Sequence, residues 1–384
     1  MKKRTRILSG ILALILAFSL LSGALVTMTG AAPVDADEAA TAIGQRIYDQ
    51  IMEWVDCFLE WLRNLFGLYP KLPVDPTEPT EPPAPDGTPV PAGSSLAEAV
   101  AALGDEGGTL ILEEGDYEID ARLDIGANTS IIGADGAVIK SAAGIGSRLL
   151  VITGSNVTLD KLVIDGSDTP GESMKAIFTE GSSLENIVIT NNTFLDIPND
   201  AIDLSNCISP VVTGNKISGV TDNGIRIGFH NSPASKPALV QNNVIDGHTT
   251  TNGSIWIESG EGYIIVSNNT IKGVESKPGI GSSDVKTAAI HMYQISKSSN
   301  ILVENNTITD CQRGISVYKY DAELAGDKIV VRNNTITNSL YFDVSLSNLD
   351  HYSPSAGALC VVEIANSGVV TNQNNHIGTN FAIQ

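Results

Sequence analysis

Residues that can pair charges, move protons or stack on rings recur in three short segments of the chain. These segments read "GIRIG" from residue 224, "SIWIE" from 254 and "AIHMY" from 289. Between their apolar residues stand Arg226, Trp256, Glu258, His291 and Tyr293. An arginine can neutralise a carboxylate, a glutamate, histidine or tyrosine can move a proton, and an aromatic face can stack on a ring of a ligand. Together they could bind or transform a polar ligand, provided that the three segments lie side by side.

The alternation of apolar and polar residues predicts strands that each bury one face. The segments "AIDLS" from 201 and "GISVY" from 314 repeat the same alternation. The inward positions are Ile202, Ile225, Ile255, Ile290 and Ile315. The outward positions then form two columns, one of Asp203, Arg226, Trp256, His291 and Ser316 and one of Ser205, Gly228, Glu258, Tyr293 and Tyr318. Because stacked strands lie about 4.8 Å apart, we expect the two columns to form one exposed patch.

An asparagine repeat precedes these strands, as in "NNTF" at 191, "NNVI" at 242 and "NNTI" at 268, 305 and 333. Some copies match the Asn-x-Thr pattern for N-linked sugar, but the threonine is replaced in others while the second asparagine recurs. The preceding residue is Asn or Gly, and both tolerate a left-handed backbone, so each unit predicts a strand, a sharp bend and another strand. We expect the second asparagines to stack in a structural ladder that passes amide hydrogen bonds between coils. Its members are Asn192, Asn215, Asn243, Asn269, Asn306, Asn334 and Asn375.

The spacing of these asparagines, mostly 23–28 residues with no crossover helix, is typical of a solenoid whose coils stack as parallel sheets. Together with "SLAEAVAALGDEGGTLILEEGDYEI" from residue 95, the repeats resemble the right-handed parallel β-helix of the pectate lyase-like superfamily. The resemblance covers residues 94–384. It implies an all-β, single-stranded solenoid of about ten coils with a short helix that caps its N-terminal end. It points to no specific enzyme family, since Glu258 and Ser259 stand where the pectate lyase strand has Asp-His.

Three segments precede the predicted β-helix. Residues 1–32 have a basic start, an apolar stretch and small residues at the end, which indicates a signal peptide and a protein that is secreted or held on the surface of a bacterium. Residues 33–69 are predicted to form an amphipathic helical segment, whose part 35–67 we expect either to pack on a partner or to contact the cell envelope. Residues 70–93 are a linker rich in Pro, Thr and Glu. The formal net charge of −21 argues against nucleic acid as a partner.

The resemblance implies a carbohydrate-active protein whose polysaccharide lies along the strands that carry the two columns. As a polysaccharide lyase on an acidic polysaccharide, it would use Arg226, Glu258, His291 and Tyr293 as catalytic residues. Arg226 would neutralise the carboxylate of the sugar, and His291 or Tyr293 would be the base. Asp203, Trp256 and Tyr318 would bind the substrate, and Asp203 with Glu258 could hold a Ca²⁺ ion.

Two alternatives compete with the lyase hypothesis. Glu180, in "AIFTE" one coil before Asp203, lies diagonally from it at about 8 Å between Cα atoms. That separation suits the two carboxyl groups of an inverting glycoside hydrolase. The other alternative is a non-catalytic module that binds glycans or acts in adhesion.

Overall fold

The computed structural model describes residues 86–169, 173–279, 287–320, 329–340, 342–347 and 361–363. The predicted signal peptide and helical segment, most of the linker, and Asn375 lie outside these residues. Within them, no helix is long and apolar enough to cross a membrane.

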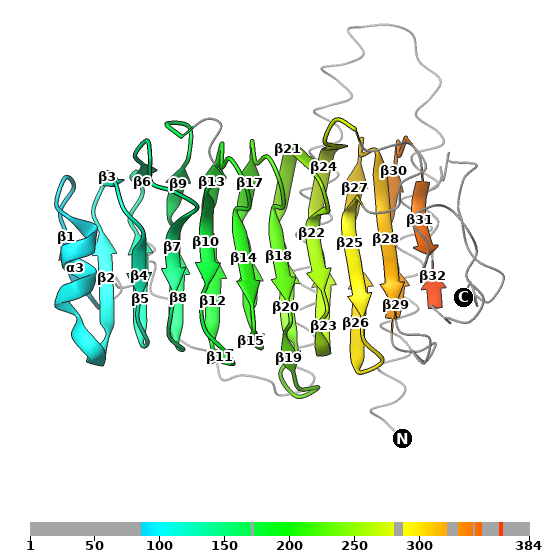
Figure 1. Ribbon diagram of the computed structural model, residues 1–384, viewed down its shortest axis with the longest axis horizontal. Helices are drawn as coiled ribbons and strands as arrows, with labels where there is room; N and C mark the ends of the chain where they lie inside the picture. The colour runs from blue at the N-terminus through cyan, green and yellow to red at the C-terminus, as the bar shows by residue number, and fades with distance from the viewer. Residues whose placement is uncertain are drawn as a thin grey trace, which may run out of the picture. The chain divides into compact units, whose positions relative to one another are not determined.

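The described chain winds into stacked coils whose strands form three parallel sheets (Figure 1). Sheet A contains β1 (Thr88–Val90), β2 (Gly108–Leu112), β5 (Thr129–Gly133), β8 (Val157–Asp160), β12 (Ile187–Thr190), β16 (Val211–Thr213), β20 (Ala238–Gln241), β23 (Glu261–Ser267), β26 (Ser299–Glu304), β29 (Ile329–Arg332) and β32 (Val361–Glu363), with β19 (Asn231–Ser232) beside β23. Sheet B contains β3 (Gly115–Ile119), β6 (Ala137–Ser141), β9 (Val163–Asp165), β13 (Thr193–Leu195), β17 (Lys216–Ser218), β21 (Val244–Thr250), β24 (Thr270–Ser276), β27 (Thr307–Thr309) and β30 (Thr335–Thr337).

Sheet C carries the segments that the sequence singled out. It contains β4 (Leu123–Ile125), β7 (Arg148–Ile152), β10 (Lys175–Thr179), β14 (Ile202–Ser205), β18 (Ile225–Gly228), β22 (Gly253–Glu258), β25 (Ala288–Ile295), β28 (Arg313–Tyr320) and β31 (Phe342–Ser347). A short extra pair joins β11 (Leu184–Glu185) to β15 (Cys207–Ile208). Sheets B and C each have nine strands, so the described residues form nine coils, close to the predicted ten.

The N-terminal end of the solenoid is capped by the predicted short helix, α3 (Leu96–Ala102), followed by the 3-10 turn η1 (Gly104–Glu106). The Ser95 side chain caps the helix by accepting a hydrogen bond from the Glu98 main-chain N–H at 3.2 Å. Leu96 is buried in the core. Strand β1 pairs with β2 and lies inside the range predicted as linker, so the first coil begins before residue 94.

The asparagine ladder is confirmed for its six described members. The side-chain amides of the first five donate to the side-chain oxygen of the next rung at 2.8–3.0 Å, so that the row runs from Asn192 to Asn334. Each amide also donates to a main-chain carbonyl of sheet A, such as Leu159 or Val303. The preceding residues all have the predicted left-handed backbone, with φ between 53° and 70°. The repeated asparagine motif therefore forms a buried turn, and its side chains satisfy the polar groups of that turn.

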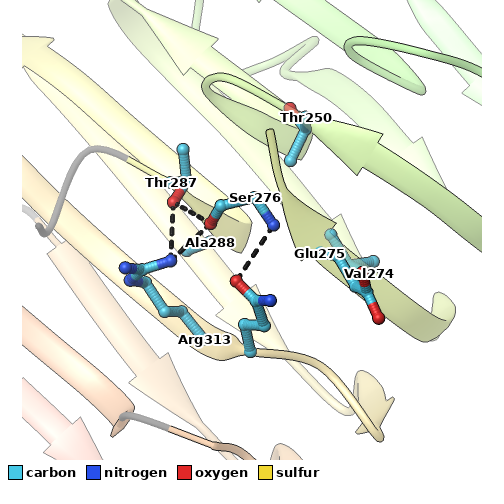
Figure 2. Close-up of a pocket in the computed structure, with 8 residues that line it drawn as sticks. Thr250, Val274, Glu275, Ser276, Thr287, Ala288 and Arg313 are labelled. Atoms are coloured by element: carbon cyan, nitrogen blue, oxygen red, sulfur yellow. Dashed lines mark hydrogen bonds between the residues drawn. The ribbon is translucent and has the colours of Figure 1, made fainter. Parts of the chain in front are cut away.

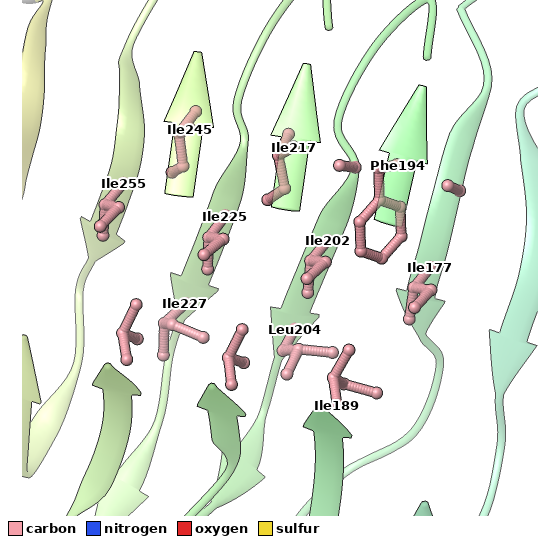
Figure 3. Packing of buried hydrophobic residues seen from close by; sticks show 14 of the residues in the cluster. Ile177, Ile189, Phe194, Ile202, Leu204, Ile217, Ile225, Ile227, Ile245 and Ile255 are labelled. Atoms are coloured by element: carbon pink, nitrogen blue, oxygen red, sulfur yellow. The ribbon is translucent and has the colours of Figure 1, made fainter. Parts of the chain in front are cut away.

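Branched apolar side chains fill the interior between the sheets. Ile177, Ile202, Ile225 and Ile255 stack on successive strands of sheet C and face Phe194, Ile217 and Ile245 of sheet B (Figure 3). The predicted inward positions are therefore confirmed. This fixes the opposite face of sheet C as the surface that carries the candidate residues, because side chains alternate along a strand.

Candidate functional site

The two predicted columns are present on the outer face of sheet C. Strand pairing sets Asp203 beside Arg226, then Trp256, His291 and Ser316, in that order. The second column follows as Ser205, Gly228, Glu258, Tyr293 and Tyr318. The register brings these residues side by side on one face of sheet C.

The exposure predicted for this patch is wrong at several positions. Asp203, His291, Ser316 and Tyr318 are buried, while Trp256 and Tyr293 are partly buried. Cations from the strands on both sides enclose Asp203, and stacked rings cover His291 and Tyr318. Neighbouring side chains thus remove from solvent positions that strand alternation alone leaves outside.

A chain of ion pairs runs across sheet C through Asp203. The Lys175 ammonium lies 2.8 Å from the Asp200 carboxylate and also contacts Asp203. Arg226 contacts Asp203 at 2.6 Å on one side and Glu258 at 2.5 Å on the other. The Asp203 side chain is 0% exposed, so both of its oxygens face cations rather than a ligand.

The pKa shifts of the basic residues in these ion pairs favour their charged, paired forms. Burial by itself would lower the pKa of Arg226, but the charges of Asp203 and Glu258 outweigh it and raise that pKa. The same balance, with Asp200 and Asp203 as partners, raises the pKa of Lys175. Burial raises the pKa of Asp200 despite its contact with Lys175. Arg226 is therefore already neutralised by protein carboxylates, which does not suit the predicted neutralisation of a sugar carboxylate.

His291 sits among aromatic rings. Its ring centroid lies 6.1 Å from that of Tyr293 and 6.2 Å from that of Tyr318, and the two tyrosines are 5.5 Å apart. Trp256 continues the row at 6.3 Å from Tyr293. Burial lowers the pKa of His291 to about 3, and its buried Nδ1 has no hydrogen-bond partner among the described residues. An imidazole of such low basicity is poorly matched to the predicted role of general base.

Glu180 and Asp203 do not form the pair of free carboxyls that an inverting hydrolase needs. Glu180 follows β10 and contacts Arg122 at 2.8 Å as well as Arg148. Asp203 has no exposed surface from which to activate a water molecule. The two carboxylates of the predicted Ca²⁺ site are not free either, since Asp203 and Glu258 both bind Arg226. No group of three or more His, Cys, Asp or Glu in the described part of the chain could hold a metal ion.

Sequence reasoning missed a second buried polar row at the start of the sheet C strands. The Asp200 carboxylate accepts from the Asn223 main chain at 3.0 Å and from its side-chain amide at 2.7 Å, and the Asn223 side chain accepts from the Gly253 main chain at 3.2 Å. The signal was present in the recurring "NDAI" at 199, "DNGI" at 222 and "TNGSI" at 251. Lys175, which begins β10, was missed because the aligned strands carry no other lysine there.

A small pocket lies at the corner of sheets B and C (Figure 2). Its lining includes the buried Arg313, which donates to the Thr287 hydroxyl at 3.0 Å and to Ser276. Ser276 in turn accepts from or donates to Thr287 at 2.7 Å, and its main chain donates to Gln312 at 3.1 Å. None of the predicted site residues lines this pocket. It is held together by its own hydrogen bonds and is separate from the patch.

Comparison with known proteins decides the family. A family model described as a right-handed beta helix region matches residues 130–271 and 175–382. The chain belongs to the right-handed β-helix family. No curated protein matches this β-helix chain.

Solved structures similar to this β-helix protein include the A-module of a mannuronan C-5 epimerase from Azotobacter vinelandii. It is 16% identical, and the match covers 75% of this chain and 92% of that one with a TM-score of 0.37. An endo-xylogalacturonan hydrolase from Aspergillus tubingensis is 17% identical over 78% and 99% of the two chains, with a TM-score of 0.25. A pectin methylesterase in complex with a hexasaccharide is 11% identical over 67% and 94%, with a TM-score of 0.29. Similarity at this level concerns the fold alone.

Proposed function

We propose that this β-helix protein binds a carbohydrate on the outer face of sheet C. The observation that supports this is a unit of an aromatic ring, an arginine and a glutamate that occurs twice on that face. In the first unit, Arg148 lies over the Phe178 ring at 4.0 Å and pairs with Glu180. In the second, Arg226 lies over the Trp256 ring at 4.8 Å and pairs with Glu258.

The two units share the order of their residues, although Arg226 pairs in register with Trp256 and Arg148 with Lys175 rather than with Phe178. The glutamate follows the aromatic residue by two positions, in "FTE" and "WIE", and the arginine comes from the preceding coil. Phe178 and Trp256 are three strands apart in the same column, which corresponds to about 14 Å. Both rings are partly exposed. Aromatic faces with fixed guanidinium and carboxylate groups beside them suit sugar rings and their hydroxyls, and a repeated unit suits a polymer.

The charges on this face favour a neutral glycan. Among the ion-paired side chains of the described part of this face, four cations, Arg122, Arg148, Lys175 and Arg226, stand against five carboxylates, Asp124, Glu180, Asp200, Asp203 and Glu258. The balance leaves no excess positive charge for an acidic polysaccharide. This differs from the acidic substrate expected from the sequence, because Arg226 pairs with Asp203 and Glu258.

Cleavage by a polysaccharide lyase is the second candidate. It is favoured by the arrangement of Arg226, Glu258 and Tyr293 on three consecutive strands, β18, β22 and β25. Binding without cleavage fits better, because Arg226 is ion-paired twice and the buried His291 has a strongly lowered pKa.

The test is affinity electrophoresis of the full chain through gels that contain xylan, β-glucan, galactan, pectate or alginate. We expect retardation by at least one neutral glycan, and a weaker effect by about tenfold for both Phe178→Ala and Trp256→Ala. Tyr263→Ala removes an exposed aromatic ring from sheet A and serves as the matched control, with retardation unchanged. Absence of retardation in every gel, or equal retardation of the wild type and both sheet C variants, would contradict the proposal.

A further inference from the structure

Phe229 combines two properties that its place in the fold does not require. It follows the end of β18, its side chain is 49% exposed, and its backbone has φ of 50°. A left-handed backbone is unfavourable for a bulky residue and suits Gly, Asn or Asp. Among the described non-glycine residues with positive φ, Phe229 is the only apolar or aromatic one; the others are Asn, Asp, Ser, Lys or Gln.

The same corner recurs in the neighbouring coils with polar residues. Asn206 follows β14 with φ of 56°, and Ser259 follows β22 with φ of 47°. Main-chain hydrogen bonds link these corners, from Asn206 to Gly228 at 3.0 Å and from Phe229 to Glu258 at 2.8 Å. The corner therefore accepts Asn or Ser, and nothing in its backbone selects a phenylalanine.

The core beneath the corner does not select it either. The next residue, His230, turns inward and is buried, and its carbonyl accepts from the Glu261 main chain at 2.7 Å. His230 packs so closely on Gly260 that a Cβ there would lie 2.2 Å from its Nε2. The residues beside Phe229 are thus closely packed, while the Phe229 side chain itself is exposed.

Phe229 borders the second aromatic unit. It follows Gly228, which pairs with Glu258 and has no side chain to separate the two residues. Trp256 pairs with Arg226, three positions before Phe229. The Phe229 main-chain N–H donates to the Glu258 carbonyl at 2.8 Å, and Glu258 lies two positions after Trp256, which is about 7 Å along the strand and longer than one pyranose ring.

We infer that Phe229 is a glycan-binding residue at the edge of sheet C, and that the ligand is at least a disaccharide which contacts both Trp256 and Phe229. This inference rests on the proposed function. It accounts for an exposed ring in an unfavourable backbone conformation, since such conformations persist where a function uses them.

The experiment compares Phe229→Asn with Ser259→Asn, which introduces the same residue at the equivalent corner one coil later. Thermal unfolding of the full chain should show that Phe229→Asn raises the Tm by about 2 °C, because asparagine tolerates the left-handed backbone. Calorimetric titration then uses the hexasaccharide and the monosaccharide of whichever neutral glycan, xylan, β-glucan or galactan, retards the wild type. Phe229→Asn should weaken binding of the hexasaccharide about tenfold and leave binding of the monosaccharide unchanged.

Ser259→Asn should bind both sugars as the wild type does, and Phe229→Tyr should keep the affinity because it keeps the ring. Equal affinity of the wild type and Phe229→Asn for the hexasaccharide would overturn the inference while leaving the proposed function intact. A fall in the Tm of Phe229→Asn would assign the ring to the fold and overturn it as well. A wild type that binds none of the glycans would instead overturn the proposed function and the inference with it.

Discussion

The Arg226 guanidinium on β18 donates to the Asp203 carboxylate on β14 at 2.6 Å, and Asp203 has no exposed side-chain surface. Arg226 also donates two hydrogen bonds to the Glu258 carboxylate on the following coil. One arginine thus ties three consecutive strands of sheet C together. Its first role is structural, and any ligand meets it as part of a charge-balanced surface.

Loss of this arginine should destabilise the fold. Arg226→Met removes one of the two cations that contact the buried Asp203 and leaves Lys175, and we expect a loss of about 2–4 kcal/mol in the free energy of unfolding measured with urea. Arg122→Met removes an arginine whose ion pairs are exposed to solvent and should therefore change stability much less than Arg226→Met. If the two variants are equally stable, Arg226 does not hold the strands together.

The asparagine ladder should be sensitive in its middle. Asn306→Ala removes one amide that accepts from the Asn269 side chain and donates to Asn334 and Val266. Since these partners are buried and would lose a hydrogen bond each, the free energy of unfolding should fall by about 1–3 kcal/mol. Glycan selectivity should stay the same. A stable Asn306→Ala protein with a changed glycan preference would show that the ladder is part of the binding site.

Stability should fall in acid because of His291. Its pKa is lowered from an ordinary 6.5 to about 3 in the folded protein, so the unfolded chain binds a proton there first. The stability that results from this difference in pKa is fully present above pH 6.5. It is lost as the pH falls towards 3, by up to about 1.4 kcal/mol per pH unit. Between pH 6 and pH 4, His291→Gln should show a shallower fall in the free energy of unfolding than the wild type. Parallel curves would mean that His291 is not held neutral by burial.

The corner beneath Phe229 should not tolerate a larger residue on the next coil. A methyl group at Gly260 would lie 2.2 Å from His230 Nε2, so Gly260→Ala has to displace a buried ring. We expect a loss of about 1–3 kcal/mol. Gly126→Ala meets nothing within 4 Å and is the control, with little change in urea unfolding. Equal stability of the two variants would show that the corner can rearrange.

Much of this fold follows from local patterns in the sequence. The period of two in "AIDLS" and "GIRIG" sets which residues face inward, and the repeated asparagine sets the bend, so the register of Asp203 beside Arg226 could be predicted. The burial of Asp203 could not, because it depends on Lys175 and Arg226 reaching it from two other coils. A single sequence shows which residues share a column, but not which of them neutralise one another.

The most direct test of the proposed function is one calorimetric titration of the wild-type chain with the retarding glycan, in the presence of calcium, followed by analysis of the same sample for cleavage. We predict saturable binding that Trp256→Ala weakens, with no unsaturated product and no new reducing ends after prolonged incubation. Cleavage products that appear with the wild type and disappear with Tyr293→Phe would contradict a binding role and establish an enzyme on the same face of sheet C.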